Sequence, residues 1–256
     1  MLPPDLTRVP PGARSWDEMT VRKPLDLSFE GFPEDAFAIL QRLRAHPHID
    51  QYREDKPGIQ AHIKAPFKQY RNDLVVNWVL PSRLALETEK NVFSRLLKND
   101  FGAGGCHDHR WMAFYRPDYR RLTDVQLSHS LGPDGLKIGL YAGSYGTEVL
   151  KQVQASIARQ PERFRALVNE LLRDEGWTFR FYRGSGAQRN YDAFDQPLAA
   201  LPEGLSSADG MWLRTCIPAA VVVADGPYLI RRALRHIAAL WPLYRFYLID
   251  EQAPNA

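Results

Sequence analysis

The chain has 256 residues, of which 45% are hydrophobic and 25% charged, and its formal net charge is +3. This profile is typical of a globular protein with a sizeable core, and the charge is smaller than that of most nucleic-acid-binding domains. The chain has two cysteines, Cys106 and Cys216, and no CxxC motif. These counts exclude a disulfide-stapled fold and a structural zinc ribbon.

Neither a signal peptide nor a membrane span is expected. The N-terminal residues lack the apolar stretch of a signal peptide. The longest apolar run, IPAAVVVA at 217–224, is far shorter than the roughly 20 residues that a membrane helix needs. We therefore expect a cytoplasmic protein.

The first part of the chain predicts an arm followed by helices. Residues 1–27 carry five prolines, which predicts a proline-rich arm, packed through Trp16 and Met19, ahead of a single domain over 28–250. A helix is expected between Pro33, which suits a first helical turn, and Pro47, because apolar residues recur at helical spacing. A second helical stretch over 57–76 restarts at Pro66, and 84–98 reads as strand-rich.

The middle and end of the chain predict a sheet among further helices. Strands near 110–116, 123–130 and 136–142 form an antiparallel meander closed by the GPDG turn at 132–135. Two helices then meet at Pro161, with Thr147 as the N-cap of the first and Gly176 stopping the second. A strand at WTFRFYRG and a loop-rich segment follow. Two buried strands, MWLRTCIP and AAVVVAD, precede a closing helix. The order predicts an α+β fold, a central antiparallel sheet with helices before, between and after the strands.

The segment NDFGAGGCHDHRWMAFY at 99–115 concentrates reactive side chains. His107 and His109 are spaced to point to one face of an extended chain, so both imidazoles reach one divalent metal ion, while Asp108 points the other way. A third ligand must come from elsewhere, with Glu87, Glu89 or Asp100 as candidates. Alternatively the two histidines carry protons. The structural alternative is a glycine-rich excursion between strands.

A second interpretation of this segment makes Cys106 a nucleophile with a neighbouring histidine as base. Catalytic pairs of this kind are usually distant in sequence. A small buried residue is the competing interpretation of Cys106.

The stretch YAGSYGTEVL at 141–150 predicts an anion site. A strand there enters a glycine-rich loop and then a helix, whose unpaired N–H groups and dipole favour an anion. The expected ligand-binding residues are Gly143, Ser144, Gly146 and Thr147, helped by Lys98, Arg110 or Arg120. A plain strand-to-helix turn is the structural alternative.

Several quoted stretches together resemble a bacterial family known as domain of unknown function 2461. They are FEGFPEDAFAILQRL, Lys56, IKAPFKQYRNDLV, NVFSRLLKND, LYAGSYGTEVLKQVQASIARQPERFRALV and WPLYRFYL, and the resemblance covers about 29–248. The chain departs from the family pattern at Lys98 and Asn99, and FGAGGCHDHRW replaces a basic stretch. The family has no established activity, so the resemblance implies a fold and a compartment.

Three hypotheses about function follow, and the sequence names no reaction. The first is a small-molecule enzyme or binder whose ligand is a small anionic molecule. Its acid–base or metal chemistry would come from His107, His109, Asp100 and Cys106. The second is a non-catalytic module that binds a partner protein, using the N-terminal arm. The third is nucleic-acid binding through Arg116, Arg120 and Arg121, ranked last because the net charge is small.

Overall fold

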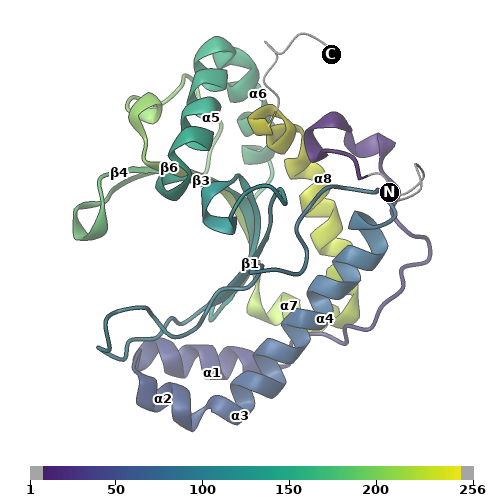
Figure 1. Cartoon of the computed structure of the whole chain (residues 1–256), viewed down its shortest axis with the longest axis vertical. Helices are drawn as coiled ribbons and strands as arrows, with labels where there is room; N and C mark the ends of the chain where they lie inside the picture. Colours follow the sequence, from purple (N-terminus) through teal and green to yellow (C-terminus); the bar gives the residue numbers. More distant parts are fainter. Residues whose placement is uncertain (1–7, 249–256) are drawn as a thin grey trace.

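The computed structural model describes residues 8–248, which form a curved six-stranded sheet with helices packed around it (Figure 1). The strands are β1 (Arg110–Phe114), β2 (Gln126–Gly132), β3 (Gly135–Gly143), β4 (Trp177–Arg183), β5 (Asn190–Phe194) and β6 (Gly210–Pro218). The helices are α1 (Glu34–Ala45), α2 (Ile49–Glu54), α3 (Lys56–Gly58), α4 (Ala65–Leu74), α5 (Thr147–Arg159), α6 (Pro161–Leu172), α7 (Ala219–Asp225) and α8 (Leu229–Leu248).

The sheet has the strand order β1-β2-β3-β6-β4-β5, and every neighbouring pair is antiparallel. The predicted meander is present as β1, β2 and β3, while β6, the last strand in sequence, inserts between β3 and β4. Helices precede, interrupt and follow the strands, so the predicted α+β class is confirmed.

The two faces of the sheet differ because side chains alternate along each strand. One face carries buried apolar residues, including Leu127, Ile138 and Leu213. Helices α5, α7 and α8 pack on the central strand β3, and α6 packs on β4; α8 and α4 lie on the same side of the strands (Figure 1). The other face carries polar, small and aromatic residues at the alternate positions and is the open face of the sheet.

The N-terminal helices follow the sequence prediction with small shifts. Pro33 is the N-cap of α1 rather than its first residue. The helical stretch predicted over 57–76 is present and continues to Val79, with π-helical turns at Ile59–Lys64 and Val75–Val79. Pro66 is the second residue of α4, which follows directly on the π-helical turn at Ile59–Lys64.

The described part of the arm, residues 8–27, packs on the protein's own core. The Trp16 ring lies 6.0 Å from Trp78 and 6.2 Å from Trp241. The Trp78 indole donates to the Met19 sulfur at 3.2 Å, and the Trp241 indole donates to the Arg14 carbonyl at 2.9 Å. The two predicted anchors are therefore both in contact with the core, and residues 1–7 lie outside the described chain.

Some sequence predictions were wrong in their local detail. The segment AAVVVAD is helix α7, because Pro218 ends β6 and the Ala219 N–H bonds to the Asp134 carbonyl instead of to a strand. The segment after β4 was read as mostly loop, yet it contains β5. Residues 84–98 form isolated bridges, such as Phe93 with Met112, rather than a regular strand.

Among residues 8–248, no helix combines the length and the hydropathy that crossing a membrane requires.

Candidate functional site

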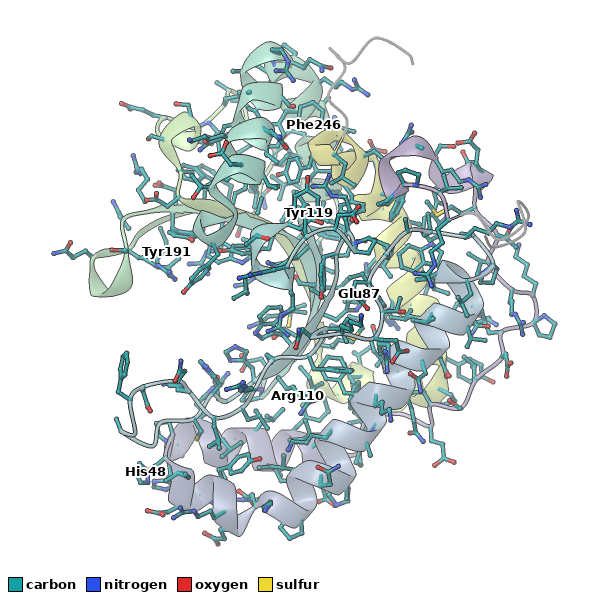
Figure 2. The ribbon with its side chains drawn as sticks, viewed as in Figure 1. His48, Glu87, Arg110, Tyr119, Tyr191 and Phe246 are labelled. Carbon is teal, nitrogen blue, oxygen red and sulfur yellow. The ribbon has the colours of Figure 1, made fainter. Side chains whose placement is uncertain are left out.

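The open face of the sheet is hollowed by a cleft of about 530 Å³, a size within the usual range of small-molecule sites. It lies across the central strands, between the edge strands that carry Arg110 and Tyr191 (Figure 2). Its floor consists of three cross-strand rows, fixed by the register of β1, β2, β3 and β6. The turn-side row, nearest the β2–β3 turn, consists of Trp111, Ser130 and Lys137. The middle row consists of Ser128, Gly139 and Arg214. The loop-side row, nearest the loop that follows β3, consists of Gln126, Tyr141 and Trp212.

The hollow exists because the middle row begins with small residues. Ser128 and Gly139 are partners across β2 and β3, and the Ser128 hydroxyl donates to the Gly139 carbonyl at 3.2 Å. A Cβ at Gly139 would overlap the Leu213 carbonyl and the Arg214 side chain. This position has no room for a side chain, because β6 lies too close, and the floor of the cleft therefore stays low at the middle row.

The cleft is electropositive. Lys137, Arg189 and Arg214 line it, and no carboxylate is found among the described residues of its lining. None of the three cations forms an ion pair within residues 8–248, whereas Arg44, Arg116 and Arg232 do. Burial, reinforced by nearby Arg180, lowers the pKa of Arg214 from its ordinary value. The Arg189 guanidinium lies 4.6 Å from the centre of the Tyr182 ring. Guanidinium and ammonium groups without a carboxylate partner in a concave site are suited to an anionic ligand.

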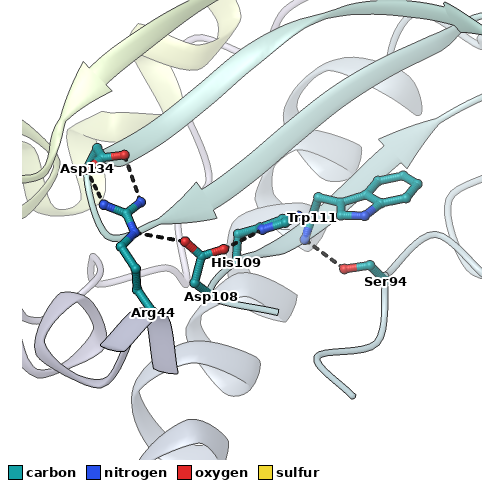
Figure 3. A network of polar contacts seen from close by, with 6 residues as sticks. All are labelled: Arg44, Ser94, Asp108, His109, Trp111 and Asp134. Carbon is teal, nitrogen blue, oxygen red and sulfur yellow. Dashed lines mark hydrogen bonds and ion pairs between the residues drawn. The ribbon is translucent and has the colours of Figure 1, made fainter. Parts of the chain in front are cut away.

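His109 lies at the edge of the cleft and is held by a chain of polar contacts (Figure 3). Its Nδ1 is 2.9 Å from Oδ1 of Asp108. The other oxygen of Asp108 accepts from Nε of Arg44 at 2.9 Å, and Arg44 also donates to both oxygens of Asp134, at 2.8 and 2.9 Å. The chain ties the histidine to α1 and to the β2–β3 turn.

This chain of contacts keeps Asp108 ionised and sets which nitrogen of His109 faces it. Burial alone would favour the neutral acid, but hydrogen bonds from His109 and Arg44 hold the pKa of Asp108 below its ordinary value. An ionised carboxylate only accepts hydrogen bonds, so Nδ1 of His109 carries the proton. Nε2 of the neutral ring is then the group able to accept one. A carboxylate that accepts a hydrogen bond from one ring nitrogen orients a histidine for proton transfer at the other.

His107 is the second imidazole of the cleft, with its ring centroid 5.3 Å from that of His109. Burial, together with the neighbouring His109 and Lys98, lowers the pKa of His107. It is therefore neutral at pH 7. The prediction that Asp108 points away from the histidines was wrong, because residues 107–109 form a bend rather than a regular strand.

The described residues do not bring a third metal ligand to the two histidines. No group of three or more His, Cys, Asp or Glu side chains able to hold a metal occurs in this part of the chain. Glu87 accepts from the backbone of Glu89 and Lys90 at 2.8 and 2.9 Å. Glu89 pairs with Arg71, and Asp100 is held in its own loop.

The other residues of the 98–106 loop lie away from the cleft. Asp100 accepts from the Gly105 N–H at 2.6 Å, and Lys98 and Asp100 line a separate depression at the tip of the loop beside His48. Cys106 is 1% exposed, its Sγ lies 3.5 Å from the His48 carbonyl, and burial raises the pKa of its thiol. These features are those of a packing residue rather than of a nucleophile.

The predicted anion loop borders the cleft through one residue. Tyr145 lines the cleft and is 66% exposed. Gly143 ends β3, and Gly146, not Thr147, is the N-cap of α5. A Cβ at Gly146 would overlap the backbone of Thr123, so neighbouring chain covers the loop there. The side chain of Ser144 lies outside the described part of the structure.

The cations predicted to help the loop are not in the cleft. The Arg110 guanidinium lies 5.0 Å from the centre of the Phe93 ring. Arg120 is exposed and caps a short 3-10 turn through its backbone contacts with Thr123. Arg116, proposed for nucleic acid, is engaged by the buried carboxylate of Asp124 at 2.5 Å.

Sequence reasoning missed most of the lining. The sequence did contain a signal for these residues. Lys137 and Arg214 are polar residues that alternate with apolar ones in two predicted strands, and Gln126 likewise precedes the apolar Leu127 in a third. The register that joins them into one surface is not visible in any single segment. Arg189 comes from the segment that was read as loop.

A larger cavity, of about 790 Å³, lies between the arm and α8. Its charged lining residues include Arg231 and Arg235, and it contains none of the predicted site residues. The open-face cleft is the better candidate because it joins unpaired cations, two histidines and aromatic rings on a rigid sheet.

Comparison of the sequence with models of protein families and with curated proteins found no match. The resemblance to domain of unknown function 2461 stays a prediction.

Proposed function

We propose that the open-face cleft binds a small anionic molecule and that His109 serves there as a proton-transfer group. The observation that carries the proposal is the set of three cations, Lys137, Arg189 and Arg214, which line a concave surface without a carboxylate partner. A phosphate or carboxylate would pair with these groups without displacing an existing ion pair. This revises the expected position of the anion from the 143–147 loop to the sheet itself.

The chemistry that the cleft offers is acid–base chemistry. Nε2 of His109 accepts a proton from the bound molecule or from water, and Asp108 stabilises the imidazolium that results. Lys137 follows Ser130 in the same row as Trp111, and it lines the same cleft as the two histidines. The proposal covers a binder or an enzyme of small anions and names no reaction.

The test measures binding of inorganic phosphate to the full chain by calorimetry and by the shift of the melting temperature at low salt. We expect phosphate to raise the melting temperature of the wild type, and the double variant Lys137→Gln/Arg214→Gln to lose at least about tenfold in affinity. The matched control is Lys68→Gln/Arg95→Gln, two exposed cations that form no ion pair within residues 8–248 and lie outside the cleft.

Two results would overturn the proposal. One is the absence of any phosphate-dependent shift in the wild type. The other is an equal shift in the wild type and in the Lys137→Gln/Arg214→Gln variant, which would place the anion elsewhere. Circular dichroism of each variant establishes that the fold is retained.

A further inference from the structure

The loop-side end of the cleft is aromatic. Tyr141, Tyr145 and Trp212 line it, and we call them the aromatic end. The rings of Tyr141 and Trp212 are 5.1 Å apart between centroids and tilted by 32°. Tyr145 is 66% exposed, so an apolar ring stands in solvent at the rim. Such rings at a concave site are suited to contact a planar ligand by stacking.

Glycines let these rings lie along the sheet. A Cβ at Gly143 would overlap the ring of Tyr141, and one at Gly210 would contact the ring of Tyr182. The hydroxyls of Tyr141 and Tyr182 lie 3.2 Å apart, within hydrogen-bond distance. Trp212 has Tyr182 on its other side, 5.1 Å away. Tyr191 is also stacked on Trp212, at 6.2 Å and 28°. Tyr141 and Trp212 are therefore held in place by neighbouring rings, while Tyr145 is exposed at the rim.

At the opposite end of the cleft, one face of the Trp111 ring is covered by an arginine side chain. The Arg121 guanidinium lies 4.4 Å from its centroid, so one face of this indole is covered. The turn-side end instead presents Lys137 with His107 and His109. The cleft thus has its aromatic rings at one end and Lys137 with the histidines at the other, with Arg214 and Gly139 in the row between them. The third cation, Arg189, lies on the aromatic side, where its guanidinium is 4.6 Å from the centre of the Tyr182 ring.

The spacing of the rows sets the size of the ligand. Same-face residues of a strand are two positions apart, so adjacent rows are separated by roughly 7 Å. A pentose-sized linker spans one such step. A ligand with a planar ring over the aromatic end would place its anionic group at Arg214 and Lys137, above the low floor of the middle row.

A buried amide lies beside the aromatic end. Gln126 is the cross-strand partner of Tyr141, lines the cleft and is 2% exposed. Its Nε2 has no hydrogen-bond partner among residues 8–248. Buried amide donors are ordinarily satisfied. A heteroaromatic ring carries acceptors at its edge, which this donor would recognise.

From these observations we infer that the ligand is a nucleoside monophosphate, its base against Tyr141, Tyr145 and Trp212 and its phosphate on Arg214 and Lys137. The inference rests on the proposed function and names the ligand class of the same cleft. A single nucleotide fits the volume of about 530 Å³ and matches the charge at each end.

The experiment compares adenosine 5′-monophosphate, uridine 5′-monophosphate, ribose 5-phosphate and inorganic phosphate on the full chain, by calorimetry and tryptophan fluorescence. We expect at least one of the two nucleotides to bind about tenfold or more tightly than ribose 5-phosphate and to quench the fluorescence. Tyr145→Ala and Trp212→Leu should each weaken that nucleotide at least about fivefold and leave inorganic phosphate within about twofold. Tyr228→Ala, an equally exposed tyrosine at 64% outside the cleft, is the matched control.

The outcomes separate this inference from the proposed function. If phosphate binds but ribose 5-phosphate binds as tightly as both nucleotides, the ring assignment is wrong and the anion site stands. If no phosphate compound binds, both are wrong. A tetranucleotide that binds more tightly than either mononucleotide would overturn the small-molecule assignment in favour of a nucleic-acid strand.

Discussion

Oδ1 of Asp108 lies 2.9 Å from Nδ1 of its sequence neighbour His109, and the same carboxylate is tied through Arg44 to Asp134 (Figure 3). Neighbouring residues in a regular strand point to opposite faces, so this contact depends on the bend before β1. It turns two adjacent polar residues into an oriented acid–base pair at the edge of a cationic cleft.

This pair predicts a defined tautomer. In ¹⁵N NMR of the protein at neutral pH, the uncharged His109 ring should carry its proton on Nδ1, because the ionised Asp108 accepts it. Asp108→Asn should remove that preference, whereas Asp118→Asn, an exposed aspartate, should not. An Nε2–H ring in the wild type would show that the Asp108 contact does not set the tautomer.

Arg116 should be a structural residue. Replacing it by Met leaves the fully buried Asp124 carboxylate with only a backbone N–H partner, so we expect a loss of about 2–3 kcal/mol in the free energy of unfolding. Arg120→Met, at an exposed neighbour, should change it by less than about 0.5 kcal/mol. Urea unfolding measures both, and equal values for the two variants would contradict the assignment.

We expect that only glycine is tolerated at position 139, in the floor of the cleft, without a loss of stability. Gly139→Ala places a methyl against the backbone of Leu213, and we expect a destabilisation of about 1–3 kcal/mol. Gly132→Ala is the matched control on the same strand pair, since its methyl would meet the Cβ of His109 at an ordinary 3.6 Å. Thermal and urea unfolding compare the stabilities of the two variants. A Gly139→Ala variant as stable as the wild type would show that β3 and β6 accommodate the methyl group and would contradict the prediction.

His129 should make the protein sensitive to acid. It is fully buried against the Tyr70 hydroxyl at 2.9 Å, and burial, with a contribution from His236, lowers its pKa to about 3. The unfolded chain takes up this proton near pH 6.5. The stability is therefore complete above that pH and falls by up to about 1.4 kcal/mol per unit as the pH drops toward 3.

The measurement is urea unfolding between pH 7 and pH 4. His129→Asn keeps an acceptor near the Tyr70 hydroxyl but does not titrate there, so its stability should fall less steeply than that of the wild type. His46→Asn, at an exposed position, should keep the full slope. Parallel curves for the wild type and His129→Asn would exclude this residue as a source of the acid sensitivity.

Trp16 should make the arm part of the fold. Trp16→Ala removes ring contacts with Trp78 and Trp241, and we expect a loss of about 2–3 kcal/mol. Asp17→Ala, at the exposed neighbouring position, should cost less than about 0.5 kcal/mol. A Trp16→Ala variant as stable as the wild type would return the arm to the role of a strap for a partner.

Several helices and strands could be predicted from the sequence alone, because their signals lie within a short segment of the chain. The helical stripe before Pro47, the two helices that meet at Pro161, and the closing helix were readable because apolar residues recur at the helical period and prolines mark the ends. In LKIGLYAG and MWLRTCIP, apolar and other residues alternate with a period of two, which predicted two strands. The segment AAVVVAD was misread because a short apolar run has no period that separates strand from helix.

The tertiary structure decided which residues form the candidate site. Lys137 and Arg214 lie far apart in the sequence, and they meet because the last strand, β6, inserts beside β3. His109 joins them through a bend, and Gly139 makes room for the cleft between them. Strand order and register are set by long-range pairing, which no short window of sequence encodes. The sequence of the histidine segment predicted reactive groups, and only the sheet placed the two histidines in the same cleft as Lys137 and Arg214.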